Sequence, residues 1–369
     1  MMSEARRRIS LFMESLGGGG AERVMLNLAR EFSRLGHQVD LVVAMATGPY
    51  RSQVPDSVTL VDLGTTRTIT AILPLAGYLR RESPDVLLSQ MGHCNIVSLL
   101  GRKLARSATR VVISEVSLMG VSTANPVQLR SRLIPLFAKK LYPQADGIIT
   151  VSHGAADDLA HVLDLPLDRI DVIYNPVVTP ELHERAGRMA DHPWFAEGAP
   201  PVIIGVGRLD PEKDFLTLLR ASNIVRRNRN VRLMILGEGP ERFALESLAQ
   251  ELGMTSAVSL PGFVENPLPF IANASVLVLT SRFEGLSNVL IEALACGTPV
   301  VATDCPGGPT EILGGGHYGK LAPVGDFIEV ARAIEETLEN PPDPMFLKSA
   351  AERFSVDAIA RQYLEVLIG

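Results

Sequence analysis

The sequence of 369 residues contains few aromatic side chains, few cysteines and no long apolar run. Aromatic residues make up 5% of it, with Trp194 as the single tryptophan, which argues against a module that stacks sugars on aromatic platforms. Cys94, Cys296 and Cys305 are odd in number and lack the spacing of metal ligands, which argues against a disulfide framework. We expect them to be buried thiols of a protein in a reducing cytoplasm.

No run of about 18 apolar residues is present, so no segment is expected to span a bilayer. The apolar stretch after Arg6–Arg8 is too short for a signal peptide and is more typical of a first strand. Hydrophobic residues make up 46% of the chain and charged residues 21%, which allows sizeable cores and excludes wholesale disorder. With about 150 residues per domain, the length predicts two domains.

Charge is distributed unevenly along the chain. Residues 1–145 carry 18 Lys and Arg against 10 Asp and Glu, whereas residues 146–369 carry 17 against 31. The net charge of −6 disfavours a nucleic-acid-binding protein. The basic excess in the first part indicates either a surface for an anionic partner or an ordinary solvated basic face.

Short apolar runs alternate with segments of helical period along most of the chain. Strands are predicted at 9–13, 39–44, 58–63, 86–89, 111–114, 147–151 and 170–174, and then at 202–206, 231–236, 258–260, 276–280 and 300–303. Helices are predicted at 21–35, 69–82, 94–106, 127–141, 154–163, 214–227, 240–252, 288–296, 326–339 and 355–367. This alternation predicts two α/β domains with doubly wound parallel sheets and a cleft between them.

The alternation breaks after Asn175 and Pro176, where prolines and a polar string predict a linker over 176–200. The predicted domains are therefore 1–175 and 201–353, followed by a C-terminal helix at 354–369. Ligands of open α/β sheets bind at the carboxyl ends of the strands. The residues that follow each strand are thus the candidates for a functional site.

The first candidate is the glycine run Gly17–Gly20, which follows the first strand and opens a helix. Glycines there let a phosphate or a sugar approach the backbone, and the helix N-terminus offers free N–H groups. A plain flexible turn is the alternative. The run does not match the GxGxxG fingerprint with a later acidic residue, so a dehydrogenase is disfavoured.

The second candidate is the loop 205–213, which follows the first strand of the second domain. Arg208 and Lys213 lie five residues apart in it and could converge on a diphosphate, Arg as a fork and Lys as a point charge. The alternative is a solvated lysine and an arginine paired with Asp210 or Glu212.

The third candidate contains Glu284 and Glu292, the first in a loop and the second inside a helix capped by Ser287 or Asn288. Amides at this helix N-terminus could hold phosphate, while the carboxylates accept hydrogen bonds from sugar hydroxyls. A charged Glu292 in the apolar run 289–295 is costly without a partner, which argues against an ordinary exposed glutamate.

Together these segments resemble the retaining glycosyltransferase family 4, whose fold, called GT-B, has two Rossmann-like doubly wound domains facing a cleft. In the order of the chain, the matching parts are the Gly-Gly-x-Glu loop at 19–22, the segments 145–152 and 172–176, Arg208 with Lys213, and the E-x7-E pair Glu284 and Glu292. The run at 284–303 is the most specific part. The resemblance covers nearly the whole chain.

The resemblance implies roles for these residues. Arg208 and Lys213 would hold the donor diphosphate. Glu292 would bind the ribose hydroxyls, and Glu284 would lie beside the donor sugar. The backbone amides that would complete the phosphate and acceptor cradle are those of Gly17, Gly18, Gly19, Leu286, Ser287, Asn288 and Val289. The second domain would bind the nucleotide and the first the acceptor, and the last helix would cross back to the first domain.

Two departures from the family pattern stand out. Asp214 follows Lys213 where the family often has glycine, which leaves the shape of this loop open. Many members place a histidine at the end of the fourth strand, whereas here Gln90 lies near that point and His93 slightly later. His93 is therefore predicted either to contact the sugar or to cap a helix.

Basic residues recur in the segment 129–141, where Arg130, Arg132 and Lys139 flank apolar residues at helical spacing. A basic amphipathic helix of this kind lies on anionic lipid, unless it is a core-facing helix with a solvated basic face. The stretch 305–313 resembles family members that extend lipid-linked or exopolysaccharide oligosaccharides. A polyprenyl-diphosphate acceptor would account for the basic part of the chain.

We therefore predict a retaining, metal-independent glycosyltransferase with His93, Glu284, Arg208 and Lys213 as catalytic residues. It would move a sugar from a nucleotide-diphosphate sugar, preferably UDP-linked, to a glycan or a polyprenyl-diphosphate-linked saccharide in cell-surface polysaccharide biosynthesis. The resemblance implies no cofactor besides this co-substrate. A GT-B sugar-nucleotide epimerase and a non-enzymatic nucleotide-sugar-binding protein are the alternatives. We expect a cytoplasmic protein, with peripheral contact to the inner face of an anionic membrane left open.

Overall fold

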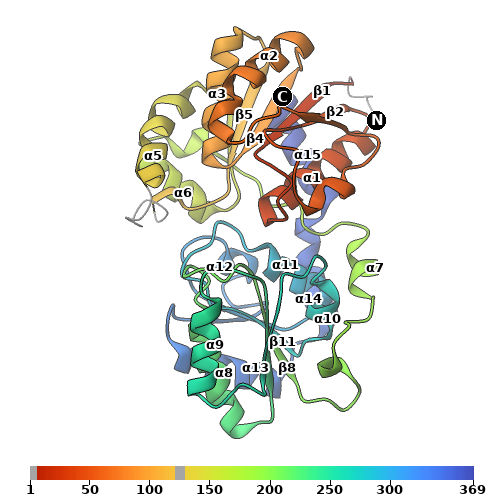
Figure 1. Ribbon diagram of the computed structural model, residues 1–369, viewed down its shortest axis with the longest axis vertical. Coiled ribbons are helices and arrows are strands. Elements are labelled where there is room, and N and C mark those ends of the chain that lie inside the picture. Colours follow the sequence, from red (N-terminus) through yellow and green to blue (C-terminus); the bar gives the residue numbers. More distant parts are fainter. Residues whose placement is uncertain (1–5, 121–128) are drawn as a thin grey trace. The chain divides into compact units, whose positions relative to one another are not determined.

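The computed structural model describes residues 6–120 and 129–369, and in the helix at 129–141 it describes the side chains from residue 134 onward. The chain divides into two compact units (Figure 1). The first unit is Met1–Val177 together with Phe354–Gly369, and the second is Val178–Arg353. Each unit contains one parallel sheet with helices packed on it, so the prediction of two doubly wound α/β domains is confirmed.

The sheet of the first unit has seven strands in the order β3-β2-β1-β4-β5-β6-β7. Their bounds are β1 (Arg8–Met13), β2 (Gln38–Val43), β3 (Thr59–Asp62), β4 (Val86–Gln90), β5 (Arg110–Glu115), β6 (Gly147–Thr150) and β7 (Asp171–Val172). Leu11 at the centre of β1 pairs with Leu41 on one side and Leu88 on the other. All three are fully buried, as expected for parallel strands that are covered on both faces.

The helices of the first unit form two apolar cores with this sheet. The helices are α1 (Gly20–Arg34), α2 (Ile72–Glu82), α3 (Gly92–Ala105), α5 (Leu129–Leu141), α6 (His153–Leu163) and α15 (Val356–Ile368), with single turns η1 (Pro49–Gln53), η2 (Thr68–Ala71), η3 (Tyr142–Gln144) and η4 (Leu167–Arg169). One core contains Phe32 of α1 and Tyr363 of α15. The other contains Leu75 of α2 and Val97 of α3. The C-terminal helix α15 therefore packs beside α1 in the first unit (Figure 1).

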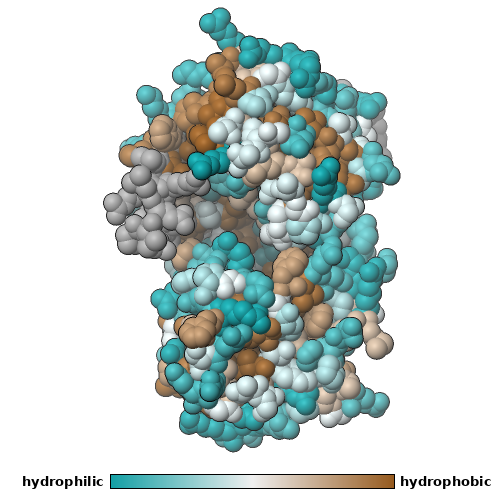
Figure 2. Space-filling view, viewed as in Figure 1, coloured by the Kyte–Doolittle hydropathy of each residue, from teal (hydrophilic) through white to brown (hydrophobic). Residues whose placement is uncertain are grey.

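Some apolar side chains of the first unit stay at the surface. Figure 2 shows apolar residues exposed over α2 and α3. Leu73 of α2 is 69% exposed and Leu104 of α3 is 46% exposed. Leu136 and Phe137 of α5 are 69% and 52% exposed. The helix packs on the core through Ala138 and Leu141, as the core-facing alternative predicts, while Leu136 and Phe137 point to solvent.

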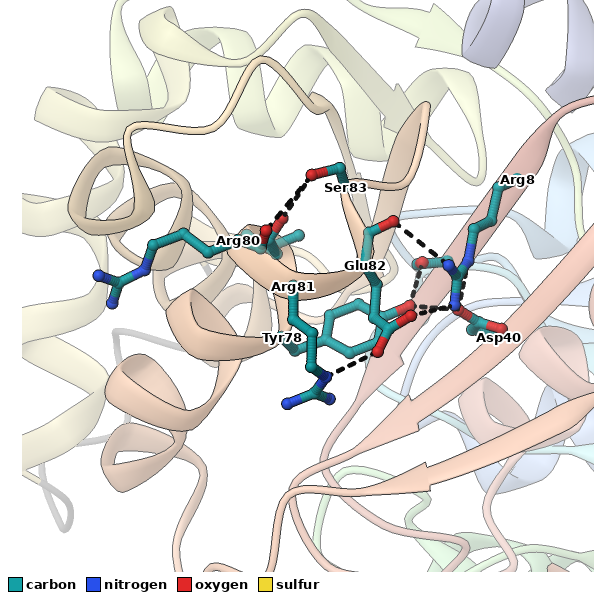
Figure 3. Close-up of polar contacts among 9 residues, drawn as sticks. Arg8, Asp40, Tyr78, Arg80, Arg81, Glu82 and Ser83 are labelled. Carbon is teal, nitrogen blue, oxygen red and sulfur yellow. Dashed lines mark hydrogen bonds and ion pairs between the residues drawn. The ribbon is translucent and has the colours of Figure 1, made fainter.

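A buried polar network joins α2 to β1 and β2 (Figure 3). Asp40 is fully buried, and its Oδ2 accepts hydrogen bonds from Arg8 Nη2 at 2.8 Å and from the Tyr78 hydroxyl at 2.5 Å. Arg8 Nη2 also lies 2.8 Å from a carboxylate oxygen of Glu82 at the end of α2. A buried carboxylate is costly unless it is paired, so these contacts fix α2 on the sheet.

The sheet of the second unit has six strands in the order β10-β9-β8-β11-β12-β13. They are β8 (Val202–Val206), β9 (Arg232–Leu236), β10 (Val258–Gly262), β11 (Val276–Leu279), β12 (Val300–Thr303) and β13 (Lys320–Ala322). The helices are α7 (Leu182–Ala186), α8 (Phe215–Asn228), α9 (Arg242–Glu251), α10 (Leu268–Asn273), α11 (Asn288–Cys296), α12 (Pro309–Ile312), α13 (Phe327–Glu339) and α14 (Pro344–Ala351), with single turns η5 (Pro193–Phe195) and η6 (Glu352–Phe354). Leu218 of α8 and Ile334 of α13 meet Ile203 of β8 in the core.

The sequence prediction missed β13 and the helices α7, α10, α12 and α14. None of them exceeds eight residues, and hydrophobic periodicity needs a longer window. The sequence predicts a linker over 176–200, and residues 178–200 of it belong to the second unit and contain α7. The prediction of buried thiols is confirmed for Cys94 and Cys305 but wrong for Cys296, which is half-buried because it lies at the C-terminal end of α11.

A second buried polar network lies at the carboxyl ends of β4 and β5. Glu115, the last residue of β5, is 3% exposed, and its Oε2 accepts a hydrogen bond from the Tyr142 hydroxyl at 2.8 Å. Asn95 Nδ2 donates to the Tyr142 hydroxyl oxygen at 3.2 Å and to the Ser114 carbonyl at 2.9 Å. Burial raises the pKa of Glu115 to about 7, although Tyr142 and Ser117 both donate hydrogen bonds to its carboxylate.

We expect this raised pKa to make the folded protein less stable as the pH rises. Between pH 4.5, the ordinary pKa, and pH 7, the folded protein retains a proton that the unfolded chain releases. The free energy of unfolding therefore falls across this window, by roughly 3 kcal/mol for this one group. Glu115→Gln lacks this dependence, so it should gain stability relative to the wild type between pH 5 and pH 8 in urea unfolding. A stability difference that does not change with pH would contradict this assignment.

Candidate functional site

Both sheets reverse their strand order at the centre, between β1 and β4 in the first unit and between β8 and β11 in the second. In doubly wound sheets, the loops that follow the two central strands diverge and leave a site for ligands. In the second unit these loops are 207–214 and 280–287. They contain Arg208, Lys213 and Glu284, which the sequence predicted as site residues.

Lys213 and Glu284 form an ion pair that joins the two loops. Lys213 Nζ lies 2.6 Å from Glu284 Oε1, and the two side chains are only 20% and 9% exposed. The Ser281 hydroxyl donates to the same carboxylate oxygen at 2.6 Å, and the Thr280 hydroxyl donates to the Lys213 carbonyl at 3.0 Å. A lysine ammonium carries three N–H groups, so the pair leaves Lys213 able to donate to a further anion.

A tight backbone contact holds the Glu284 loop. The Glu284 N–H donates to the Pro306 carbonyl at 3.0 Å. Gly307 has φ +109°, and a Cβ there would lie 1.6 Å from the Glu284 carbonyl oxygen, so only glycine fits. Burial, followed by the charge of Glu284, raises the pKa of the neighbouring Cys305 thiol to about 12, which keeps this thiol neutral.

Arg208 lies in the same loop as Lys213, but it makes different contacts. Its Nη2 lies 2.8 Å from Asp210 Oδ2 and 3.5 Å from Glu212 Oε1, and its side chain is 75% exposed. These are the pairings that the sequence offered as the alternative to a diphosphate contact. Ion pairs this exposed contribute little stability, so the guanidinium can exchange them for another anion at low cost. The diphosphate contact of Arg208 stays a prediction.

Asp214 adopts the backbone conformation of a glycine at the position where the resemblance predicted one. Its backbone is left-handed, with φ 46° and ψ 46°, a conformation that aspartate tolerates better than most residues. Its side chain caps α8 by accepting from the Thr217 N–H at 3.4 Å, and Oδ2 lies 3.3 Å from Arg282 Nε. Sequence reasoning missed this contribution, although an aspartate directly before a helical run is a recognised N-cap signal.

The helix α11 begins at Asn288, shortly after Glu284 in the sequence. Its N-cap is Ser287, whose side chain makes no capping hydrogen bond. Leu286 and Ser287 are buried, and Glu292, on the second turn of α11, is half-buried. Burial, and then the charge of Glu292, raise the pKa of Cys296 to about 12. Backbone N–H groups at such a helix start favour an anionic group, as the sequence predicted for residues 286–289.

In the first unit, the glycine loop Gly17–Gly19 follows β1 and precedes α1, with Gly18 at φ +93°. The Glu22 side chain folds back onto this loop, since a Cβ on Gly19 would lie 2.5 Å from Glu22 Oε2. This carboxylate already offsets the partial positive charge of the helix start. An anionic ligand at this helix start would meet the Glu22 carboxylate.

His93 lies across the central reversal of the first sheet from this loop. Its Nε2 is 3.2 Å from Glu14 Oε2, and both side chains are more than one-third exposed. The N-cap of α3 is Met91, with no side-chain capping bond, so the capping alternative for His93 is wrong. Gln90 is only 1% exposed, which leaves His93 as the more accessible of the two candidates for a sugar contact. The sequence missed Glu14, although it directly follows the first strand.

Three further points concern the basic helix, metal ligands and membrane-spanning helices. Arg130 and Arg132 belong to the basic-helix prediction, but their side chains lie outside the described residues. Within 6–120 and 129–369, no three His, Cys, Asp or Glu side chains gather as a metal site would require. Over the same ranges, no helix combines the length and the apolar character needed to cross a membrane.

Comparisons with known proteins find relatives over 98% of this chain. The chain is 29% identical over 385 residues to the Campylobacter jejuni N-acetylgalactosamine-N,N'-diacetylbacillosaminyl-diphospho-undecaprenol 4-alpha-N-acetylgalactosaminyltransferase, covering 98% of this chain and all of the relative. It is 26% identical to the Erwinia amylovora amylovoran biosynthesis glycosyltransferase AmsD, over 80% of both chains. The fold matches that of Anabaena Alr3699/HepE in complex with UDP-glucose, with a TM-score of 0.81, 20% identity and 98% and 99% coverage.

Two family models divide the chain between them. The model described as Glycosyltransferase Family 4 matches residues 18–180, and the model described as Glycosyl transferases group 1 matches residues 191–354. The resemblance predicted from the glycine loop, the Arg208–Lys213 segment and the E-x7-E pair is thereby confirmed, as is the GT-B fold. The chain is a glycosyltransferase with the GT-B fold.

Proposed function

We propose that this glycosyltransferase transfers a sugar from a UDP-sugar, with retention of configuration, to a polyprenyl-diphosphate-linked saccharide. The observation that carries the proposal is the Lys213–Glu284 ion pair at the central reversal of the second sheet. It places a cation and a hydroxyl-accepting carboxylate 2.6 Å apart, as a sugar attached to a diphosphate requires. In this proposal the second unit binds the donor and the first unit binds the acceptor.

The proposed chemistry depends on the charge of the leaving group. Glycosyl transfer passes through an oxocarbenium-like state while negative charge builds on the departing diphosphate. Lys213, already held by Glu284, would stabilise that charge without having to be ordered during the reaction. Arg208 would exchange its exposed ion pairs for the diphosphate. Amides at the start of α11 would add to this effect. These groups supply the charge stabilisation for which other transferases use a metal ion.

The carboxylates recognise hydroxyl groups in this proposal. Glu284 would accept hydrogen bonds from the donor sugar, and the half-buried Glu292 from the ribose. Retention follows if the acceptor hydroxyl attacks on the face from which the diphosphate leaves, passing its proton to the leaving oxygen. In the first unit, His93 and the Gly17–Gly19 loop would contact the sugars of the acceptor.

The names of similar proteins support the choice of substrates. Anabaena Alr3699/HepE is described in complex with UDP-glucose, and the Campylobacter relative is named for transfer to a diphospho-undecaprenol saccharide. We extend the UDP-sugar donor and the lipid-linked acceptor to this chain.

An acceptor of this kind lies in a membrane, so we further propose that the exposed Leu136 and Phe137, with Lys139 beside them, contact an anionic membrane surface.

The donor site is tested by two substitutions. Arg208→Ala and Glu292→Ala should each weaken UDP binding by roughly 1.5–3 kcal/mol, because each removes a charged hydrogen-bonding partner. Isothermal titration with UDP measures the loss. Arg332→Ala is the matched control, since Arg332 is similarly exposed and also lies between two carboxylates, but on α13. UDP affinity that is unchanged in both variants would refute the site assignment.

The membrane contact is tested by sedimentation with vesicles. The double substitution Leu136→Ser with Phe137→Ser should reduce co-sedimentation with anionic vesicles severalfold, because it removes the exposed apolar part of α5. Binding of the wild type should also fall as salt is added. Phe243→Ser, at a position 80% exposed in the second unit, is the control. Equal sedimentation of both variants, or no binding by the wild type, speaks against the contact.

A further inference from the structure

The turn between β4 and α3 holds a backbone conformation that few residues other than glycine adopt. Met91 has φ 76° and ψ 138°, a combination that strains a residue with a side chain. Its N–H donates to the Ser114 carbonyl at 3.1 Å, and its carbonyl accepts from the Asn95 N–H at 2.9 Å. Strain of this kind persists only where the surroundings determine the conformation from several sides.

Asn95 connects this turn to the rest of the first unit. It is fully buried, and its Oδ1 accepts from the Ser89 hydroxyl at 2.9 Å. Its amide group donates to the Ser114 carbonyl and to the Tyr142 hydroxyl oxygen. These contacts connect α3 to β4, β5 and the turn η3. In them the Asn95 oxygen accepts a hydrogen bond and the Asn95 amide nitrogen donates hydrogen bonds.

Glu115 and Tyr142 complete the network and pack against the turn itself. The Tyr142 hydroxyl can donate only one hydrogen bond, and it donates it to Glu115 Oε2. A Cβ on Gly92 would lie 3.4 Å from Glu115 Oε2 and 3.6 Å from the Tyr142 hydroxyl. The carboxyl group therefore packs against the strained turn. Because Tyr142 donates its hydroxyl hydrogen to Glu115, its oxygen is left to accept a hydrogen bond from Asn95.

The residue that this turn presents is His93. It lies two residues after Met91, on the first turn of α3, and contacts Glu14 at the end of β1. We propose that Glu115 is a positioning residue for His93: through Tyr142 and Asn95, its carboxyl group holds the Met91 turn that places the imidazole at the carboxyl edge of the first sheet. At 3% exposure, Glu115 acts through its neighbours and does not touch substrate. The catalytic consequence rests on the proposed role of His93 at the sugar, whereas the positioning itself does not.

The positioning is tested without an activity assay by the NMR signals of the His93 imidazole, identified by their loss in His93→Ala. Tyr142→Phe and Glu115→Leu should shift these signals, because both break the support of the turn. Glu115→Gln should leave them near their wild-type positions, since it retains an oxygen that accepts from Tyr142. Tyr78→Phe is the matched control, because it removes another buried hydroxyl bonded to a carboxylate, in the Asp40 network. Unchanged His93 signals in folded Tyr142→Phe would overturn the proposal.

Kinetics test the consequence for transfer. Tyr142→Phe and Glu115→Leu should lower kcat about tenfold or more, with the KM for the UDP-sugar nearly unchanged, because a misplaced group costs rate and the donor site lies in the other unit. In a His93→Ala background, the same substitutions should lower kcat no further. If the losses in kcat from His93→Ala and from these substitutions were additive, the proposal that Glu115 acts through His93 would be overturned. Absence of transfer by the wild type would instead contradict the proposed function, while the NMR comparison still decides the positioning.

Discussion

The reversal of strand order at the centre of each sheet is the constraint on which the candidate site depends. The chain builds three strands outward from the centre and then returns to pair the fourth beside the first, β4 beside β1 and β11 beside β8. Loops on the two sides of such a reversal run in opposite directions, which leaves their side chains facing the same space. In the first unit, Glu14 directly follows β1 and His93 lies on the first turn of α3, and in the second unit Lys213 and Glu284 lie in these loops.

In the proposed function, the Lys213–Glu284 pair binds substrate and is not required for stability. Removing two charges from water costs about as much as their attraction returns, so a buried pair is weak evidence for stabilisation. Here the surroundings are nevertheless specialised around it. Ser281 donates to the carboxylate, Thr280 fixes the Lys213 backbone, and Gly307 admits the Glu284 carbonyl. These contacts hold both side chains of the pair in place before a ligand binds, as a preorganised site for a charged substrate requires.

Much of the fold could be predicted from the sequence because parallel strands buried on both faces form continuous apolar runs. The site residues could be predicted because they follow those runs in a recognisable order. Their contacts could not, since Lys213 and Glu284 are 71 residues apart and local patterns do not report pairing at that distance. For the same reason, the ion pairs of Arg208 and the left-handed Asp214 emerged only from the three-dimensional structure.

Glu115 illustrates a further limit of sequence patterns. It looks like the polar end of an ordinary strand, and only its packing against Gly92 and Tyr142 shows that it supports a strained turn. Short elements such as β13 were missed because their stability comes from neighbours and not from their own periodicity. In both cases the deciding contacts are tertiary.

In the proposed function, Lys213 stabilises the departing diphosphate while a sugar is transferred from a UDP-sugar. The most direct measurement incubates the protein with radiolabelled UDP-sugars and a polyprenyl-diphosphate-linked saccharide and extracts the lipid-linked product. The account predicts a labelled lipid-linked saccharide with the wild type, and a loss of at least two orders of magnitude in rate with Lys213→Met, which has a similar length and no charge. Equal transfer by Lys213→Met, or conversion of the donor sugar without any transfer to the acceptor, would contradict it.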